Sequence, residues 1–397
     1  MRKERKIYNC TLTPLTPIQV GNGNQIYPYN YVIKNGFYYR IELSEILEKF
    51  PDKIKEDFIR LLENNNMIKI RSFIFDNYEE EYGYLYKAEV DKSFEELYYK
   101  KIYGTTNKNE ENQLTIEEFI GNHSGKFIPG STIKGAIRGA LLFSEFTRSI
   151  NYTLERNENN KTIPFKLVNI KKNDDAKKSN YKKFEKDESD KREAKLLGLE
   201  KSEPKVDPFK NIIVTDTKVD EDLIKIGEIK RISIKKDSTD MPMGSYEITK
   251  SNFSDNEEKN LSFSIIINDY DISEDTLNSL LKPKKNNNPD FCLIREKVNI
   301  YIEKLFKSLN SKAKRILELD KEFFSKTKRD KEIFICQKLL ERLSKLNKNE
   351  ALIRFGRGAG FNSTTLNLAN NSDMVYTRVV SDDCPVGWAI ISYNEIK

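Results

Sequence analysis

The chain has 397 residues, of which 38% are apolar, so it is long for one domain and can bury a sizeable core. Lys and Arg total 68 against 62 Asp and Glu, which leaves a net charge of +6. This mild basic bias is weak support for a polyanionic partner, because binding depends on basic groups that gather on one face.

The cysteines and the N-terminus exclude several classes of protein. Cys10, Cys292, Cys336 and Cys384 form no CxxC pair and have no histidine nearby, so a structural zinc site is not expected. A disulfide framework is unusual at this length, and we expect a reducing, cytoplasmic setting. The first 15 residues lack the apolar stretch of a signal peptide, and no run of 18 apolar residues predicts a membrane span. We expect no metal, no cofactor and no membrane contact.

Strand and helix patterns alternate irregularly along the chain. In the first part we predict a strand at 6–13, a glycine-bearing break at 16–24, a hairpin over 27–41 around Asn35–Gly36, a helix over 44–63, strands at 67–75 and 82–90, and a helix over 131–150 with Ser131–Thr132 as its N-cap.

The second part of the chain begins with a charged segment. Residues 155–206 contain few apolar side chains, and 171–195 hold ten Lys or Arg and seven Asp or Glu, which predicts a solvated insertion. Strands are then predicted at 210–217, 223–235, 261–268, 350–355 and 386–392, with helices marked by apolar residues over 293–309 and 333–346. The mixed order without a regular βαβ repeat favours the α+β class.

The most informative motif is FIPGSTIKGAIRG at 127–139. A tight turn at Pro129–Gly130 leads into a helix, and the first turn of a helix presents unpaired N–H groups that favour phosphate. Lys134 and Arg138 are four residues apart and share one helix face. The GxxxxGK[ST] order of a nucleotide-binding loop is absent. A capped helix with two surface bases is an equally good interpretation of this motif by itself.

Two further loops carry closely spaced glycines. GRGAGF at 356–361 exposes backbone N–H groups beside the guanidinium of Arg357, which suits phosphate, although a flexible turn explains it equally well. TPIQVGNG at 16–23 is a weaker signal. If the three segments converge on one sheet, they would follow a nucleic-acid backbone.

Candidate catalytic groups are few. His123 is the only histidine and lies just before the 127–139 motif, which keeps a ribonuclease open, although a lone histidine is more often structural. Asp216, at the end of IIVTDT, is interpreted as a turn or cap residue rather than a metal ligand or cleavage residue.

Five segments occur in an order that resembles a known family: TPIQVGNG, FIPGSTIKGAIRGAL, IIVTDT, LIRFGRGAGFNSTT and PVGWAIIS. Together they are similar to the RAMP superfamily of CRISPR proteins and, within it, to the fifth Csm subunits of type III-A effector complexes. The Gly387–Trp388 pair favours that group over its relatives.

The resemblance implies a ferredoxin-like (RRM-like) RAMP core with insertions and a helical C-terminal part. The implied divisions are an N-terminal core at 1–150, the charged insertion at 151–206, a continuation of the sheet at 207–290, and a helical block with the C-terminal glycine-rich loop at 291–397. The helical block would face a neighbouring subunit, although packing in the core is the commoner use of such a pattern.

The resemblance also implies a function. Such a subunit binds guide RNA (crRNA) through its backbone, caps the complex near the 3′ end of the crRNA, and helps crRNA maturation and assembly in antiviral defence. Its partners would be crRNA, the backbone and small Csm subunits, target RNA and maturation nucleases. It would be non-catalytic. The expected RNA-binding residues are Gly21, Gly23, Gly130, Ser131, Lys134, Arg138, Gly356, Arg357, Gly358 and Gly360. The alternatives are a RAMP-type endoribonuclease that processes the crRNA precursor with His123 as base, and a protein-only scaffold.

Overall fold

The computed structural model describes residues 5–63, 66–104, 114–156, 207–234, 240–251, 259–268, 300–363, 368 and 377–395. Nearly all of the predicted charged insertion lies outside these ranges, as do Leu293 and Val298 of the helix expected over 293–309. None of the helices within the described ranges is long and apolar enough to cross a membrane.

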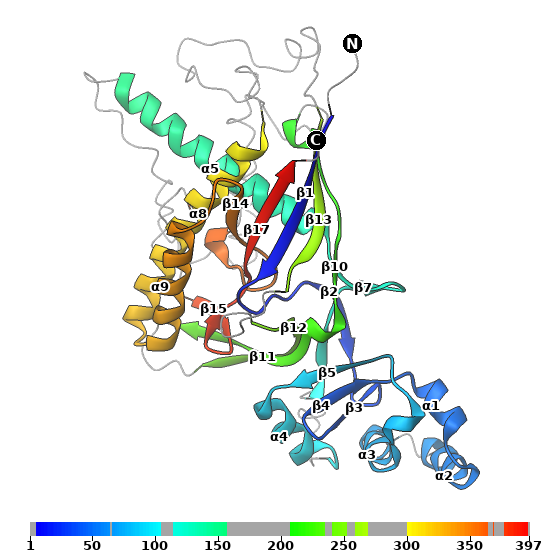
Figure 1. Cartoon of the computed structure of the whole chain (residues 1–397). Helices are drawn as coiled ribbons and strands as arrows, with labels where there is room; N and C mark the ends of the chain where they lie inside the picture. The colour runs from blue at the N-terminus through cyan, green and yellow to red at the C-terminus, as the bar shows by residue number, and fades with distance from the viewer. Residues whose placement is uncertain are drawn as a thin grey trace, which may run out of the picture.

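A five-stranded antiparallel sheet forms the centre of the molecule, in the order β14-β17-β1-β13-β9. Its strands come from distant parts of the chain: β1 (Arg5–Pro14), β9 (Ile212–Val214), β13 (Leu261–Asn268), β14 (Glu350–Arg354) and β17 (Trp388–Glu395). Apolar side chains of α5 (Gly130–Arg156) and α8 (Ile302–Lys326) share one buried cluster with those of β1 and β13, so both helices pack on this sheet. Helix α9 (Asp330–Ser344) packs against α8 (Figure 1).

A second sheet extends from this core into a lobe that lies at the far end of the molecule from α5 (Figure 1). Its strand order is β2-β6-β12-β11-β5-β4-β3, with β15 beside β11 and β16 beside β15. The strands are β2 (Gly21–Ile26), β3 (Tyr31–Lys34), β4 (Phe37–Arg40), β5 (Tyr86–Val90), β6 (Ile116–Phe119), β11 (Ile224–Ser233), β12 (Met241–Thr249), β15 (Thr377–Ser381) and β16 (Cys384–Pro385). The helices of the lobe are α1 (Leu43–Lys49), α2 (Asp52–Glu63), α3 (Met67–Asn77) and α4 (Lys92–Lys101).

Short elements complete the described part of the chain. A three-stranded sheet has the order β10-β8-β7, with β7 (Gly121–Asn122), β8 (Gly125–Ile128) and β10 (Thr217–Val219). The 3-10 turns are η1 (Glu80–Tyr82), η3 (Pro208–Asn211), η4 (Glu221–Leu223) and η5 (Phe361–Ser363). The chain therefore mixes helices and strands without a regular repeat, as its sequence predicts.

In the lobe, the predicted hairpin and the strand predicted over 82–90, seen as β5, are confirmed, and two other predictions are wrong. Strands β3 and β4 form the predicted hairpin, with both turn residues, Asn35 and Gly36, at positive φ (54° and 77°). The helix predicted over 44–63 is two helices, because Phe50 precedes a proline and adopts an extended conformation. Residues 67–75 form a helix instead of a strand: the side chain of Asn66 accepts hydrogen bonds from the backbone N–H groups of residues 68 and 69 and caps α3.

The start of α5 also differs from the prediction. The helix begins at Gly130, so Ser131–Thr132 is not its N-cap. Instead, the carboxylate of Asp216 accepts the Gly130 N–H at 2.8 Å, which is the capping role that the sequence favoured for Asp216. A Cβ on Gly130 would lie 2.0 Å from the carbonyl oxygen of Val214, so glycine is required for α5 to begin directly on the end of β9.

Two glycines of the same helix give opposite predictions for stability. We expect Gly130→Ala to lower the free energy of unfolding by about 1–3 kcal/mol, because the new methyl group overlaps the backbone of β9. Gly135→Ala is the matched control: Gly135 is exposed, and a Cβ there meets no atom within 4 Å. It should raise stability by about 0.5–1 kcal/mol because alanine favours the helix. Urea unfolding monitored by circular dichroism measures both, and equal shifts of the two midpoints would contradict the packing argument.

Candidate nucleic-acid interface

Two of the loops singled out in the sequence lie at one edge of the five-stranded sheet, and the third segment is linked to them through Ile120. Strand β17 is antiparallel to both β1 and β14, so the last residues of β1 and β14 lie beside the first residue of β17. Strand β9 runs in the same direction as β1, since both are antiparallel to β13, and its last residue contacts the start of α5. Segments 16–23 and 356–361 therefore meet at one edge, together with Gly387. Strand β9 ends further back on the sheet, because Val214 and Tyr8 both pair with Ile265. The Phe127 N–H donates to the Ile120 carbonyl oxygen and the Ile120 N–H to that of Val20, which links the 127–139 segment to the loop after β1.

Hydrogen bonds join segment 16–23 directly to segment 356–361 and to the turn at Gly387 and Trp388. The Arg357 N–H donates to the carbonyl oxygen of Gln19 at 2.8 Å, and the Gly387 N–H donates to that of Pro17 at 2.9 Å. The Trp388 N–H donates to the hydroxyl oxygen of Thr16 at 3.0 Å. The loop after β1 is thus held between the loop after β14 and the turn before β17.

The predicted glycines divide into two groups by their surroundings. A Cβ on Gly356 would lie 2.6 Å from the Gln19 carbonyl oxygen, and one on Gly358 would lie 2.7 Å from the side chains of two valines, so packing alone requires these glycines. Gly23 and Gly360 have positive φ (88° and 85°); a Cβ on Gly23 would meet no atom within 4 Å, and one on Gly360 would meet only the Gly358 carbonyl oxygen at 3.8 Å. Gly21 is exposed on β2, although a Cβ there would lie 2.8 Å from the side chain of Gln19. The α-carbons of Gly356 and Gly358 are therefore covered by the protein, whereas the second group is exposed to a ligand.

The predicted basic residues also differ. Arg138 forms an ion pair with Asp207 at 2.9 Å and lies over the ring of Phe209, so its charge is already largely matched. Lys134, one turn before it, is half-buried, and burial lowers the pKa of its ammonium group. Lys134 makes no hydrogen bond or ion pair with any residue in the part of the chain that the structure describes. Ser131 beside it is exposed.

Arg357 stacks on an aromatic ring at the surface of this edge. Its guanidinium lies 5.0 Å from the centre of the Tyr246 ring and 3.5 Å from a carboxylate oxygen of Glu117, while 37% of the side chain remains exposed. Stacking fixes the plane of the guanidinium but leaves donors free at its rim. Arg357 is therefore oriented and still accessible to a phosphate.

Comparison with known proteins assigns the chain to a family. The model of the RAMP superfamily matches residues 11–363. The chain belongs to the RAMP superfamily. It is 24% identical over 359 residues to the CRISPR system Cms protein Csm5 of Methanocaldococcus jannaschii, which covers 89% of this chain and 71% of that protein.

Two solved structures share the fold of this RAMP protein. One is a chain of a Csm–crRNA–target RNA ternary complex of a type III-A CRISPR-Cas system, with a TM-score of 0.60 and 18% identity over 98% of this chain and all of that one. The other is the crystal structure of Csm5 of T. onnurineus, with a TM-score of 0.59 and 17% identity over 96% and 99% of the two chains.

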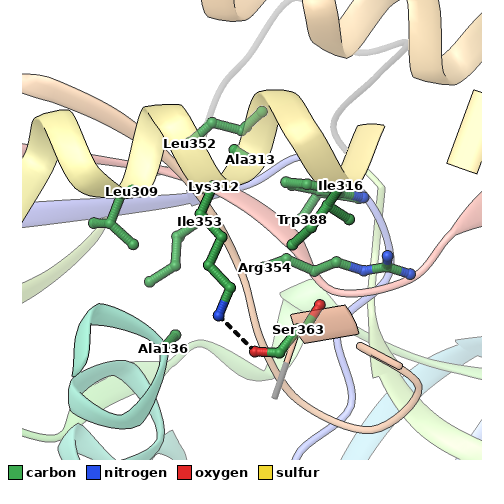
Figure 2. A pocket seen from close by; sticks show the side chains of 10 residues that line it. All are labelled: Ala136, Leu309, Lys312, Ala313, Ile316, Leu352, Ile353, Arg354, Ser363 and Trp388. Carbon is green, nitrogen blue, oxygen red and sulfur yellow. Dashed lines mark hydrogen bonds between the residues drawn. The ribbon is translucent and has the colours of Figure 1, made fainter. Parts of the chain in front are cut away.

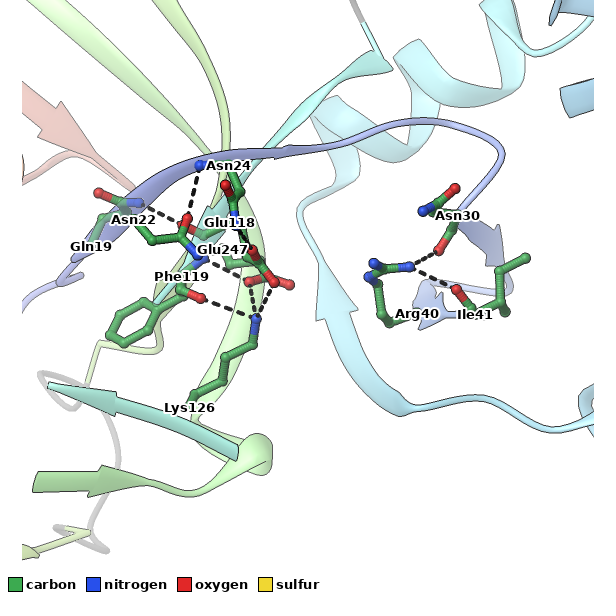
Figure 3. Close-up of polar contacts among 10 residues, drawn as sticks. All are labelled: Gln19, Asn22, Asn24, Asn30, Arg40, Ile41, Glu118, Phe119, Lys126 and Glu247. Atoms are coloured by element: carbon green, nitrogen blue, oxygen red, sulfur yellow. Dashed lines mark hydrogen bonds and ion pairs between the residues drawn. The ribbon is translucent and has the colours of Figure 1, made fainter. Parts of the chain in front are cut away.

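Behind the edge, the RAMP protein buries a lysine and a glutamate that the sequence did not single out. The Lys126 ammonium lies 2.7 Å from a carboxylate oxygen of Glu247 and 3.4 Å from one of Glu118. Glu118 in turn accepts hydrogen bonds from the side-chain amides of Asn22 and Asn24, which lie on β2 (Figure 3). This network ties the exposed glycine-bearing strand to the interior.

Burial dominates the protonation of this pair. It raises the pKa of Glu247 to about 8 and lowers that of Lys126 to about 8, because a buried site disfavours each charged form. Glu247 also accepts the backbone N–H of Phe119 at 2.8 Å. Lys126 had one sequence signal, its place just before the 127–139 motif, whereas nothing near Glu247 in the sequence indicates their contact.

The groups considered for catalysis or metal binding are scattered. His123 is exposed at the tip of the β7–β8 hairpin. Cys10, Cys336 and Cys384 are buried free thiols, and Cys292 lies outside the described residues. Within the described ranges, no three His, Cys, Asp or Glu side chains are grouped so that they could hold a metal ion.

Replacement of Lys126 should reveal how far the burial of Glu247 destabilises the fold. We expect Lys126→Met to lower the free energy of unfolding at pH 8.5 by about 1–3 kcal/mol, because the buried Glu247 carboxylate loses the hydrogen-bond donor that Lys126 supplies. The folded-state pKa of Glu247 is raised above its ordinary value of 4.5, so its protonation favours the folded state at low pH, and that stability is lost as the pH rises through about 8.

The variant should therefore recover much of its stability at pH 6. Urea unfolding at the two pH values measures this recovery, and the double variant Lys126→Met/Glu247→Leu is the control, since it removes both charges and should be far less sensitive to pH. A loss in Lys126→Met that is the same at both pH values would contradict the assignment.

Proposed function

We propose that this RAMP protein is a crRNA-binding subunit of a type III-A Csm effector complex. The observation that carries the proposal is the sheet edge where the loops after β1 and β14 meet beside the exposed Arg357, with the Lys134-bearing 127–139 segment linked to this edge through Ile120. Its family, its similarity to Csm5 and its likeness in fold to a chain of a Csm–crRNA–target RNA complex support the same function.

The RNA would contact this edge through its phosphates. Exposed Gly21, Gly23 and Gly360 allow a backbone to approach, and the Arg357 guanidinium and Lys134 ammonium supply positive charge. Such contacts position a guide without reading its bases, which suits a subunit whose target is selected by base pairing. Arg138 would contribute less, because Asp207 already neutralises it.

We further propose that the protein caps the complex near the 3′ end of the crRNA and helps maturation and assembly without catalysing cleavage. Its partners would be the backbone and small Csm subunits, target RNA and maturation nucleases. The five-stranded sheet would be a ferredoxin-like core. The chain order β1-α5-β9-β13-α8-β17, with both helices packed on the sheet, supports that interpretation, and β14 would be an added edge strand.

Within the helical block, α8 is less suited than α9 to contact a neighbouring subunit. Twelve of its residues are buried, and it packs against α5, α9 and β14. Helix α9 has a more exposed surface, which includes Phe334. We therefore assign any neighbour on this side to α9.

A salt titration tests the phosphate contacts. Lys134→Ala should weaken binding of a single-stranded guide RNA and reduce the slope of log K against log[salt] by about 0.7–1, because one phosphate loses its cation. Lys53→Ala is the matched control, since Lys53 is an exposed lysine on α2 in the distant lobe, and it should leave the slope unchanged. A slope for Lys134→Ala equal to that of the wild type would remove Lys134 from the interface.

A cleavage assay tests the non-catalytic role. We expect the pure chain to leave a labelled crRNA precursor intact while the same chain, mixed with the other Csm subunits and guide, becomes crosslinked to RNA by ultraviolet light. Cleavage that His123→Ala abolishes would establish the ribonuclease instead. Assembly with no RNA adduct on this chain would establish the protein-only scaffold.

A further inference from the structure

One of the buried cations beneath the glycine-rich loop has no carboxylate partner among the described residues. Arg354 on β14 and Arg378 on β15 both form ion pairs with one carboxylate, that of Asp320 on α8. Lys312, two turns earlier on α8, is 5% exposed and makes no ion pair with any described carboxylate. Two buried arginines therefore share the Asp320 carboxylate, while the buried Lys312 ammonium has no carboxylate partner among the described residues.

Lys312 points into a cavity of about 20 Å³ that is lined by Ala136 of the 127–139 motif and by Ser363, which follows the glycine-rich loop (Figure 2). Its ammonium donates to the carbonyl oxygen of Ser363, at the end of η5, at 2.7 Å. Among the described residues that line the cavity, Arg354 is the other charged one; α5 contributes Ala136, and β17 contributes Trp388. A buried ammonium with one carbonyl partner is costly, so its retention calls for a compensating interaction.

Both cations hold carbonyl groups of the segment that follows β14. Lys312 binds the Ser363 carbonyl, and an Nη of Arg354 lies 3.5 Å from the carbonyl oxygen of Gly358. These carbonyl groups consequently point toward the core. In the glycine-rich loop the sign of φ alternates from one residue to the next, because Gly356, Gly358 and Gly360 have positive φ (85°, 77° and 85°) and the residues between them do not.

Alternation of this kind turns successive backbone N–H groups toward one concave surface that suits an anion. The Arg357 N–H is occupied by Gln19, and that of Ala359 by Gly356. The N–H groups of Gly358 and Gly360 donate to no acceptor within the described residues. Two free donors thus remain on a loop whose carbonyl groups are held by buried cations.

We propose that Lys312 is a positioning residue for an RNA phosphate on the glycine-rich loop: it anchors the Ser363 carbonyl and places uncompensated positive charge beneath the free N–H groups of Gly358 and Gly360. The proposal rests on the crRNA-binding function and adds to it a residue on α8 that does not itself lie on the RNA-facing surface. A phosphate above the loop would be the missing counter-charge.

This arrangement couples RNA binding to the protonation of Lys312. Burial lowers the pKa of its ammonium group to about 8, whereas a nearby phosphate favours the charged form. Binding above pH 8 must then take up a proton, and affinity should fall as the pH rises, by at most about tenfold per pH unit. Arg354, the other cation that lines the cavity, keeps its charge over this range.

The test compares the full-length wild type with Lys312→Met and Lys312→Arg. Fluorescence anisotropy with a labelled single-stranded guide RNA gives the affinity at pH 7, 8 and 9 at constant ionic strength. We expect the affinity of the wild type to fall several-fold more between pH 7 and 9 than that of Lys312→Arg, whose charge does not titrate. Lys312→Met should bind several-fold more weakly than the wild type at pH 7 and match it near pH 9.

Stability separates positioning from a purely structural role. Lys312→Met removes an unpaired buried charge, so its urea midpoint at pH 7 should equal or exceed that of the wild type while RNA binding falls. Equal RNA affinities of the wild type and Lys312→Met at pH 7 would overturn the inference. If arginine does not fit the cavity, which a lowered urea midpoint reveals, the comparison of wild type with Lys312→Met decides alone. Failure of the wild type to bind RNA at any pH would instead refute the proposed function.

Discussion

The hydrogen bonds between residues 15–17 and residues 387–388 are the contact on which the arrangement of this protein depends. They join β1 to β17, which are separated by almost the whole chain, and they require the backbones to lie very close. A Cβ on Gly387 would lie 2.4 Å from the carbonyl oxygen of Phe355. Because Trp388 is fully buried directly after this glycine, with Arg354 over its ring, the turn cannot shift without unpacking the core. The glycine-bearing loops are therefore held at this edge by the central sheet itself.

The sequence predicted local structure well where the deciding interactions are local. Asn35–Gly36 specifies a two-residue hairpin turn through its backbone preference alone, and the long strands β1 and β13 carry enough apolar residues to be recognised. The prediction was wrong for α3, whose aromatic and branched residues suit a strand but whose start is capped by Asn66. It was also wrong about the start of α5, because the cap comes from Asp216, 86 residues away.

The candidate interface shows the same division between local and distant causes. Glycines mark a backbone that must approach something closely, so the motifs pointed to loops that the structure brings together. They did not reveal that Gly130, Gly356 and Gly358 approach the protein's own strands and side chains, because that partner appears only when the sheet is assembled. A glycine can be required by the packing of the protein without touching RNA. Exposure, which distinguishes Gly23 and Gly360, belongs to the folded state alone.

Charge is the property that composition describes least well in this protein. The net charge of +6 counts Arg138 and Lys126 as free cations, yet in the fold they are in contact with the carboxyl groups of Asp207 and Glu247. It gives no special weight to Lys312, although burial away from any described carboxylate lets its field act through protein rather than water. An exposed lysine at the same edge would be screened within about 8–10 Å by salt, whereas a buried one is screened much less. The placement of a cation therefore matters more than the total charge, and Lys312, which has no carboxylate partner among the described residues, lies under the loop rather than on it.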